Sequence, residues 1–138
     1  MRRELRKHLV RLLFLREFHE AEEIAEQNQL YFDVILPNEG KKTECSEEVL
    51  EKYDRIIEHL PEIDQILSSE MVKWNLKRTG LVERNILRLC TFEIRYEGIN
   101  EAIAINEAVE LAKEYGGEQS SGFINGVLAK VVNSKKAD

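Results

Sequence analysis

Glycine, proline and cysteine are scarce in this chain of 138 residues, which contains seven glycines, two prolines and two cysteines. So few turn-forming residues exclude a disordered tail and a loop-rich β protein, and they favour helices. Cys45 and Cys90 stand alone, without a CxxC pair or a neighbouring histidine motif. The sequence therefore supports neither a disulfide framework nor a zinc site.

Long apolar runs are also missing. The longest uncharged apolar runs, such as residues 12–15, are far shorter than the roughly 18 residues that a membrane span needs. No apolar signal segment with a small-residue cleavage site follows the N-terminus. The sequence therefore predicts a cytoplasmic protein. Its length predicts one compact domain over residues 1–138, with a frayed tail at 135–138.

Charge is distributed unevenly along the chain, whose formal net charge is -6. Residues 1–16 contain six cations and one anion, whereas residues 17–67 contain 15 acids and four cations. Because the Debye length is about 8 Å at physiological salt, a phosphate strand at the basic end would sense mainly the nearby arginines. An acidic net charge therefore does not exclude RNA binding.

Apolar residues recur at helical spacing almost throughout, and no run of four or more alternating positions indicates a strand. The sequence predicts an all-α fold. Its helices are expected near residues 3–18, 20–35, 46–60, 61–71, 82–96, 101–115 and 120–132, separated by residues 37–40 and by glycines at 80, 98, 116 and 117. The helix at 82–96 has apolar residues on more than one face, so we expect it to be central.

The first two predicted helices have the clearest inward faces. In the first, the core stripe consists of Leu5, Leu9, Leu12 and Leu13. In the second, the residues expected to pack inward are Ala21, Ile24, Ala25, Tyr31, Val34 and Ile35.

The opposite face of the first predicted helix collects cations. Arg3, Lys7 and Arg11 lie four residues apart, and Phe14 and Phe18 continue the same face. Like charges at this spacing destabilise an isolated helix by a few tenths of a kcal/mol, so folding alone gives no reason for them, whereas an anionic ligand does. A basic face that merely offsets the acidic remainder is the alternative. The two rings favour a surface with phosphate at one end and a protein partner at the other.

Catalytic motifs are not found. Gly116 and Gly117 follow a helical segment and lack the Lys-Ser/Thr pair that a phosphate-binding loop requires. His8, His19 and His59 have no spacing that would identify a triad, because such partners meet only in space. The acids between residues 17 and 64 mostly fall on polar helix faces that solvent covers. The sequence therefore predicts no enzyme.

Two segments carry a recognisable signature. The first reads AINEAVELAK at residues 104–113, followed by Tyr115 and Gly116 and by FINGVL at residues 123–128. The second contains Trp74 and Arg78, followed by VERNILRL at residues 82–89 and by Glu93. In order and spacing, both resemble the NusB family of transcription antitermination factors.

This resemblance implies a seven-helix fold of two packed three-helix bundles, with no enzymatic activity and no cofactor. It also implies partners: NusE, a ribosomal small-subunit protein, the single-stranded boxA element of nascent RNA, and the RNA polymerase antitermination complex of ribosomal RNA operons. The alternative is a protein-protein adaptor with an acidic helical surface and no RNA binding. The sequence leaves open whether the free protein is a monomer or a homodimer.

Candidate site residues follow from these observations. The predicted RNA-binding residues are Arg2, Arg3, Arg6, Lys7, Gln119, Ser120 and Phe123. The N-terminal cations form the densest positive cluster, beside the positive end of a helix dipole. Phe123 shares a helix line with Val127 and Val131 and could instead be core, but unpaired bases commonly stack on aromatic rings. Gln119 stands where the family often has an acid, which removes a negative charge there.

The predicted partner-binding residues are Phe14, Phe18 and Glu83. Exposed aromatic rings near an acid are typical of an interface anchor with a polar rim. The alternative is that both rings belong to the core. No metal ligands are predicted.

Overall fold

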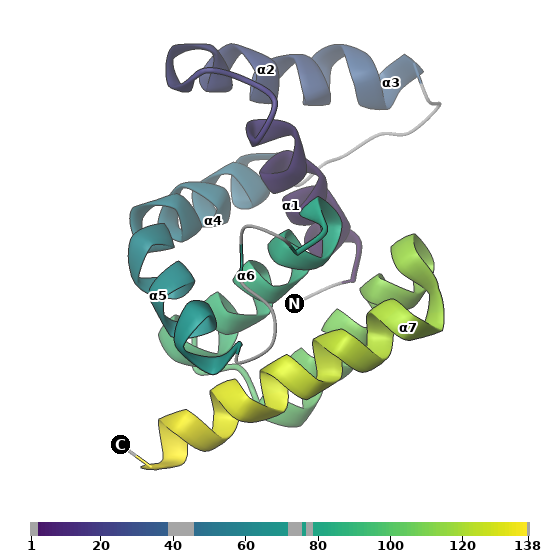
Figure 1. Ribbon diagram of the computed structural model, residues 1–138. Coiled ribbons are helices and arrows are strands. Elements are labelled where there is room, and N and C mark those ends of the chain that lie inside the picture. Colours follow the sequence, from purple (N-terminus) through teal and green to yellow (C-terminus); the bar gives the residue numbers. More distant parts are fainter. Residues whose placement is uncertain (1–2, 39–45, 72–75, 77–78, 138) are drawn as a thin grey trace. The chain divides into compact units, whose positions relative to one another are not determined.

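The computed structural model describes residues 3–38, 46–71, 76 and 79–137, apart from the side chains at positions 38 and 135–137, and its regular elements there are all helices (Figure 1). The predicted all-α class is therefore confirmed. The chain divides into two compact units, Met1–Arg55 and Ile56–Asp138. Within the described ranges, no helix combines the length and the apolar character that a bilayer span requires. The residues Arg2, Cys45, Trp74 and Arg78 lie outside the described residues.

The first unit opens with α1 (Arg3–Arg16), which buries the leucine stripe predicted from its spacing. A continuous helical run follows, and Figure 1 shows α2 and α3 as one rod. This run consists of η1 (Ala21–Glu23), α2 (Ile24–Leu30), the π-helical turn η2 (Tyr31–Ile35) and α3 (Leu36–Asn38). The last helix to begin in this unit, α4 (Ser46–Glu58), starts at the predicted serine.

The inward face predicted for the second helix is wrong in part. Tyr31 is buried as predicted, but Val34 and Ile35 are 44% and 39% exposed, and Ala21 and Ala25 are exposed as well. A π-helical turn forms hydrogen bonds from i to i+5, so a period of 3.6 residues misplaces the side chains that it carries. Their exposed apolar surface belongs to the first unit.

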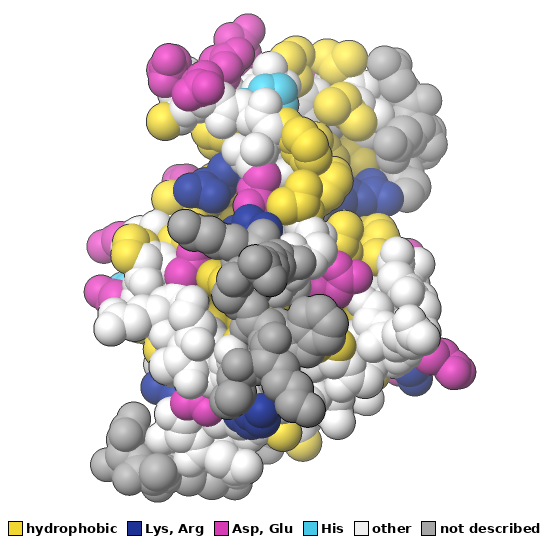
Figure 2. Space-filling view, viewed as in Figure 1, with side chains coloured by type: hydrophobic (Ala, Val, Ile, Leu, Met, Phe, Trp, Pro, Cys, Tyr) yellow, Lys and Arg dark blue, Asp and Glu magenta, His cyan; other side chains and the backbone are white. Residues whose placement is uncertain are grey.

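The same run also extends past its predicted end. It continues through Pro37 to Asn38, although proline donates no backbone N–H to the hydrogen bonds of the run. Acidic side chains gather at the start of this run (Figure 2), where Glu20, Glu22, Glu23 and Glu26 are all exposed. These acids form a solvated face, as the sequence predicts.

The second unit is built around α6 (Leu81–Tyr96), which packs mainly against α7 (Glu101–Ala137) and also against α5 (Leu60–Glu70). Residues 85–94 of α6 are buried without interruption, which confirms the predicted central helix. Pro61 lies in the first turn of α5, as its fixed φ predicts.

A partly buried ion pair joins α5 to α6. Arg88 donates from Nε to Asp64 Oδ1 at 2.8 Å and from Nη2 to Asp64 Oδ2 at 2.9 Å. Its Nη1 donates to Asn85 Oδ1 at 3.0 Å. The guanidinium is therefore held on two sides, and the two helices are fixed in register within the core of this unit.

The long helix α7 changes direction at Gly117, where φ is 84° and ψ is -169° (Figure 1). The predicted break at the glycine pair is confirmed, since this left-handed φ favours glycine. With α2 to α3 counted as one run and α7 as one element, the described residues form six helices rather than the seven implied by resemblance. The backbone of α7 is helical to Ala137, beyond the predicted end at 132, because no glycine or proline follows Gly126.

Candidate nucleic-acid interface

The cationic face of α1 lies where the sequence places it. Arg3 is exposed and Lys7 is half-buried, whereas the leucines of the stripe are buried. Arg6 differs, because its side chain is only 2% exposed, which disfavours a direct contact with phosphate. Of the predicted cations that the structure describes, Arg3 and Lys7 therefore remain at the surface of the helix.

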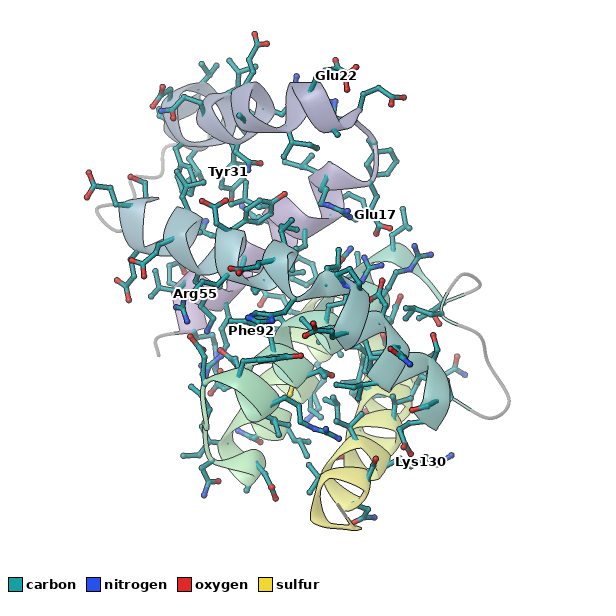
Figure 3. All side chains as sticks on the ribbon, turned by 90° about the vertical axis from the view of Figure 1, so that its left-hand side faces the viewer. Glu17, Glu22, Tyr31, Arg55, Phe92 and Lys130 are labelled. Carbon is teal, nitrogen blue, oxygen red and sulfur yellow. The ribbon has the colours of Figure 1, made fainter. Side chains whose placement is uncertain are left out.

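A second layer of polar contacts lies beneath this face. Tyr31 points from η2 toward α1 (Figure 3), and its hydroxyl lies 2.8 Å from His8 Nδ1. Arg11 Nη1 donates to the same hydroxyl at 3.5 Å. The π-helical turn thus orients one cation of the α1 face, because its buried tyrosine is an acceptor for the guanidinium.

Phe14 and Phe18 form an aromatic pair at the C-terminal end of α1. Their ring centroids lie 5.1 Å apart in an edge-to-face arrangement, a favoured geometry for two aromatic rings. Phe14 is half-buried and Phe18 is 60% exposed, so the pair is not a core contact of the first unit. Its exposed edge is available to a partner.

The second unit contains a cavity of about 370 Å³, formed by the start of α6 and by α7 around its bend. Its described lining consists of Thr79, Gly80, Glu83, Gly116, Gln119, Ser120 and Phe123. Four of these residues, Glu83, Gln119, Ser120 and Phe123, are sequence-predicted site residues. The predicted RNA-binding residues of α7 therefore line the same cavity as Glu83, which the sequence assigned to the protein partner.

Glu83 is fixed in this cavity by a hydrogen bond from α7. Ser120 Oγ donates to Glu83 Oε1 at 2.8 Å, across 37 positions of sequence. Glu83 lies in the first turn of α6, where the positive end of the helix dipole favours a carboxylate. Phe123 is half-buried and Gln119 is exposed. A carboxylate, a carboxamide and an aromatic ring therefore share one solvent-accessible cavity.

Gly116 allows α7 to approach this carboxylate. A Cβ atom at this position would lie 2.7 Å from Ser120 Oγ and 3.0 Å from Glu83 Oε1. Any side chain would therefore displace the Ser120–Glu83 hydrogen bond. The sequence identifies Gly116 as a turn and as part of the signature segment. It gives no signal that Thr79 and Gly80 line the cavity, because their contribution depends on how α6 and α7 pack.

Solved structures identify the fold. T. maritima NusB matches this chain with a TM-score of 0.78 and 34% sequence identity, over 96% of this chain and 91% of that one. A structure described as the antitermination factors NusB and NusE in complex with dsRNA has a TM-score of 0.75 over 96% of both chains. At 24% identity, it shows likeness of fold alone. The protein is thus an all-α protein with the fold of NusB structures.

Sequence comparison then identifies the family. The NusB family model matches residues 3–133. The transcription antitermination protein NusB of Lachnoclostridium phytofermentans is 49% identical over 133 residues, which cover 96% of this chain and 98% of that protein. The chain belongs to the NusB family, as its two signature segments predict.

Proposed function

We propose that this chain is a transcription antitermination factor that binds boxA-type nascent RNA together with NusE and supports transcription of ribosomal RNA operons. The observation that carries the proposal is the family match over residues 3–133. The structure described with NusE and dsRNA supports such an assembly for a chain of this fold. The proposed role requires neither a catalytic step nor a cofactor, and it places the chain in the cytoplasm, where nascent RNA is made.

The cations of α1 are the proposed phosphate contacts. Arg3 and Lys7 occupy successive turns at the N-terminus of a 14-residue helix, whose dipole adds positive potential at the same end. Phosphate contacts supply affinity without reading sequence. Arg2 belongs to the same proposal by sequence alone, whereas the burial of Arg6 assigns it to packing.

The cavity of the second unit is the proposed base site. Phe123 presents a half-exposed ring, and Gln119 and Ser120 beside it carry no charge that would repel a strand. An unpaired base stacked on an aromatic ring contributes about 1–3 kcal/mol. Base contacts can therefore add selectivity to the phosphate contacts of the first unit.

NusE is the proposed protein partner, and the Phe14–Phe18 pair is its proposed anchor. When a partner covers an exposed aromatic ring, apolar surface is removed from water. Burial of this kind usually supplies much of the binding free energy at the centre of an interface. Glu83 lines the cavity with Phe123, so it can serve NusE only where NusE reaches that cavity.

A titration at several salt concentrations tests this function. A labelled boxA-type single strand is titrated with the full chain, with and without NusE. The log-log slope of affinity against salt should be about -0.7 for each phosphate neutralised. A purely protein-protein adaptor would bind NusE and show no RNA binding at any salt concentration.

A charge-reversal pair locates the phosphate contacts. In the variant Arg3→Glu with Lys7→Glu, RNA affinity should fall by about 100-fold while helical circular dichroism is retained, because two attractive contacts become repulsive. The control variant, Lys113→Glu with Lys130→Glu, changes the net charge equally at exposed positions of α7 outside the cavity lining. Equal losses in both variants would contradict a local phosphate site on α1.

A further inference from the structure

A chain of polar contacts runs beneath the cationic face of α1 and ends at Arg11. Glu4 Oε1 lies 3.4 Å from His8 Nε2, and His8 Nδ1 lies 2.8 Å from the Tyr31 hydroxyl. Arg11 Nη1 donates to the same hydroxyl at 3.5 Å. His8 and Tyr31 are each only 2% exposed, whereas Glu4 is exposed and Arg11 is half-buried. Two side chains held in the core of the first unit therefore connect an acid and a cation at its surface.

The donors and acceptors of this chain follow one another in a single direction. An arginine only donates, so the Tyr31 oxygen accepts from Arg11, and the hydroxyl proton is left for His8 Nδ1. In a neutral imidazole the other nitrogen then carries the proton, and His8 Nε2–H is directed at the Glu4 carboxylate. Each contact joins a donor to an acceptor, so the Tyr31 hydroxyl has one preferred orientation.

Tyr31 reaches α1 from the π-helical turn η2. Single π-helical turns are rare and occur frequently at functional sites. The Tyr31 ring lies edge-to-face with Phe32 and with His8, at centroid distances of 5.1 Å and 5.8 Å. These ring contacts hold the tyrosine independently of its hydroxyl. Loss of the hydroxyl alone can therefore be distinguished from loss of packing.

Arg11 completes a row of three cations on α1. Arg3, Lys7 and Arg11 follow one another in steps of four residues, each of which rises about 6 Å along the helix axis. A hydroxyl acceptor restricts a guanidinium without cancelling its charge, as a carboxylate would. Restricting a long side chain before binding reduces the conformational entropy that binding costs. We propose that Arg11 is a third phosphate contact and that Tyr31 is the positioning residue that preorganises it, with His8 fixing the hydroxyl.

This inference rests on the proposed function, because the phosphate belongs to the RNA that the chain binds. The competing role for Arg11 is structural, in which its hydrogen bond only ties α1 to η2. The two roles differ in what they change. A structural bond affects the folded fraction, whereas a phosphate contact affects the salt dependence of RNA binding.

Arg11→Gln tests the phosphate contact. A labelled boxA-type single strand is titrated with the full chain, in the presence of NusE, at several salt concentrations. The variant should bind about tenfold more weakly, and the magnitude of the log-log salt slope should fall by about 0.7, because one phosphate is no longer neutralised. Arg55→Gln removes the same charge at an exposed position of α4 in the same unit (Figure 3) and should leave both quantities unchanged.

Tyr31→Phe tests the positioning role. The ring and the charge of Arg11 remain, so RNA affinity should fall about three- to fivefold while the salt slope is retained. In the Arg11→Gln background the same change should not alter RNA affinity, because no guanidinium is left to position. Tyr53→Phe removes the hydroxyl of another buried tyrosine of the first unit and should have the same effect in both backgrounds. Melting curves give the folded fraction for each affinity.

The outcomes separate this inference from the proposed function. If the unmodified chain binds no RNA, the proposed function fails and the inference fails with it. If RNA binds and Arg11→Gln keeps the salt slope, the inference alone is wrong, whatever Tyr31→Phe does. Equal losses for Tyr31→Phe in both backgrounds would mean that Tyr31 acts through packing, which overturns its positioning role. If Arg11→Gln weakens NusE binding but not RNA binding, Arg11 belongs to the protein interface and the inference is also wrong.

Discussion

The two units of this protein present binding groups in different ways. In the first unit, Arg3 and Lys7 lie on the outer face of α1, and the leucines of the inner face hold that helix in the core. In the second unit, a cavity is assembled from two helices and depends on the fit between Gly116, Ser120 and Glu83. An exposed cationic face suits sequence-independent contact with phosphate, whereas a shaped cavity suits selection of one base.

The two binding regions differ in how far their residues also stabilise the fold. On α1 the binding groups and the core groups are different residues, so binding can change while the fold remains. In the second unit the residues that shape the cavity also pack against one another, so a change there affects both the cavity and the stability of the fold.

The largest effect on stability is expected for Asp64→Ala, which removes the ion pair between α5 and α6 in the second unit. Removing this carboxylate leaves the Arg88 guanidinium without its bidentate partner at a buried position. The free energy of unfolding should fall by about 3–5 kcal/mol in chemical denaturation. Asp54→Ala removes an exposed carboxylate of α4 and should change it by less than about 0.5 kcal/mol. A loss below about 1 kcal/mol for Asp64→Ala would show that the ion pair does not hold this unit together.

Phe14→Ala tests a residue of the first unit whose loss should weaken partner binding more than it weakens the fold. If the aromatic pair anchors NusE, its affinity should fall by about 2 kcal/mol or more, roughly 30-fold in Kd, as measured by calorimetry. The loss of stability should be below the ~3–5 kcal/mol of a fully buried phenylalanine, because Phe14 is half-buried. A variant that unfolds, or one that binds NusE normally, would remove the anchor from this surface.

Gly116→Ala and Gly122→Ala form a matched pair in α7. The first introduces a Cβ atom against Ser120 and Glu83 and should cost about 1–3 kcal/mol of stability. The second meets nothing within 4 Å and should be neutral or stabilise by about 0.4–1 kcal/mol. Melting curves distinguish the two. Equal effects would mean that the cavity tolerates a side chain and that its shape is not fixed by Gly116.

Phe123→Ala should weaken RNA binding by about tenfold, because one stacked base is lost. Its stability cost should also stay below ~3–5 kcal/mol, since the ring is half-buried beside the cavity. RNA titration and thermal melting are measured on the same sample. A large fall in melting temperature with normal RNA affinity of the folded protein would return Phe123 to the core.

The smallest effect is expected at Glu62, which belongs neither to the cationic face of α1 nor to the described lining of the cavity. A hydrogen bond from the Tyr96 hydroxyl at 2.8 Å, and a weaker contact with His59, lower the pKa of the Glu62 carboxyl below its ordinary value. A lowered folded-state pKa stabilises the fold above the unfolded pKa, and this contribution is lost as the pH falls through the folded pKa. Tyr96→Phe should raise the pKa in an NMR titration and leave RNA and NusE affinities unchanged. An unshifted titration curve would mean that the hydroxyl does not cause the lowering.

Much of the fold was predictable because helical periodicity is a local property. The stripe of Leu5, Leu9, Leu12 and Leu13, the central helix at 82–96 and the break at Gly117 are each encoded within one or a few turns of chain. The prediction was wrong for Val34 and Ile35, where a π-helical turn replaces the ordinary period. A local rule therefore places side chains correctly only where the local geometry is the standard one.

The sequence by itself determined the helical class, the family and the residue types available for binding, because spacing and motifs are visible along the chain. Only the tertiary structure decided which of those residues meet. Glu83 and Ser120 are 37 positions apart and hydrogen-bonded, and Arg6, beside the exposed Arg3 and Lys7 in sequence, is buried. A cavity forms where the chain reverses and separate helices pack, and this depends on contacts between distant residues that no local pattern contains.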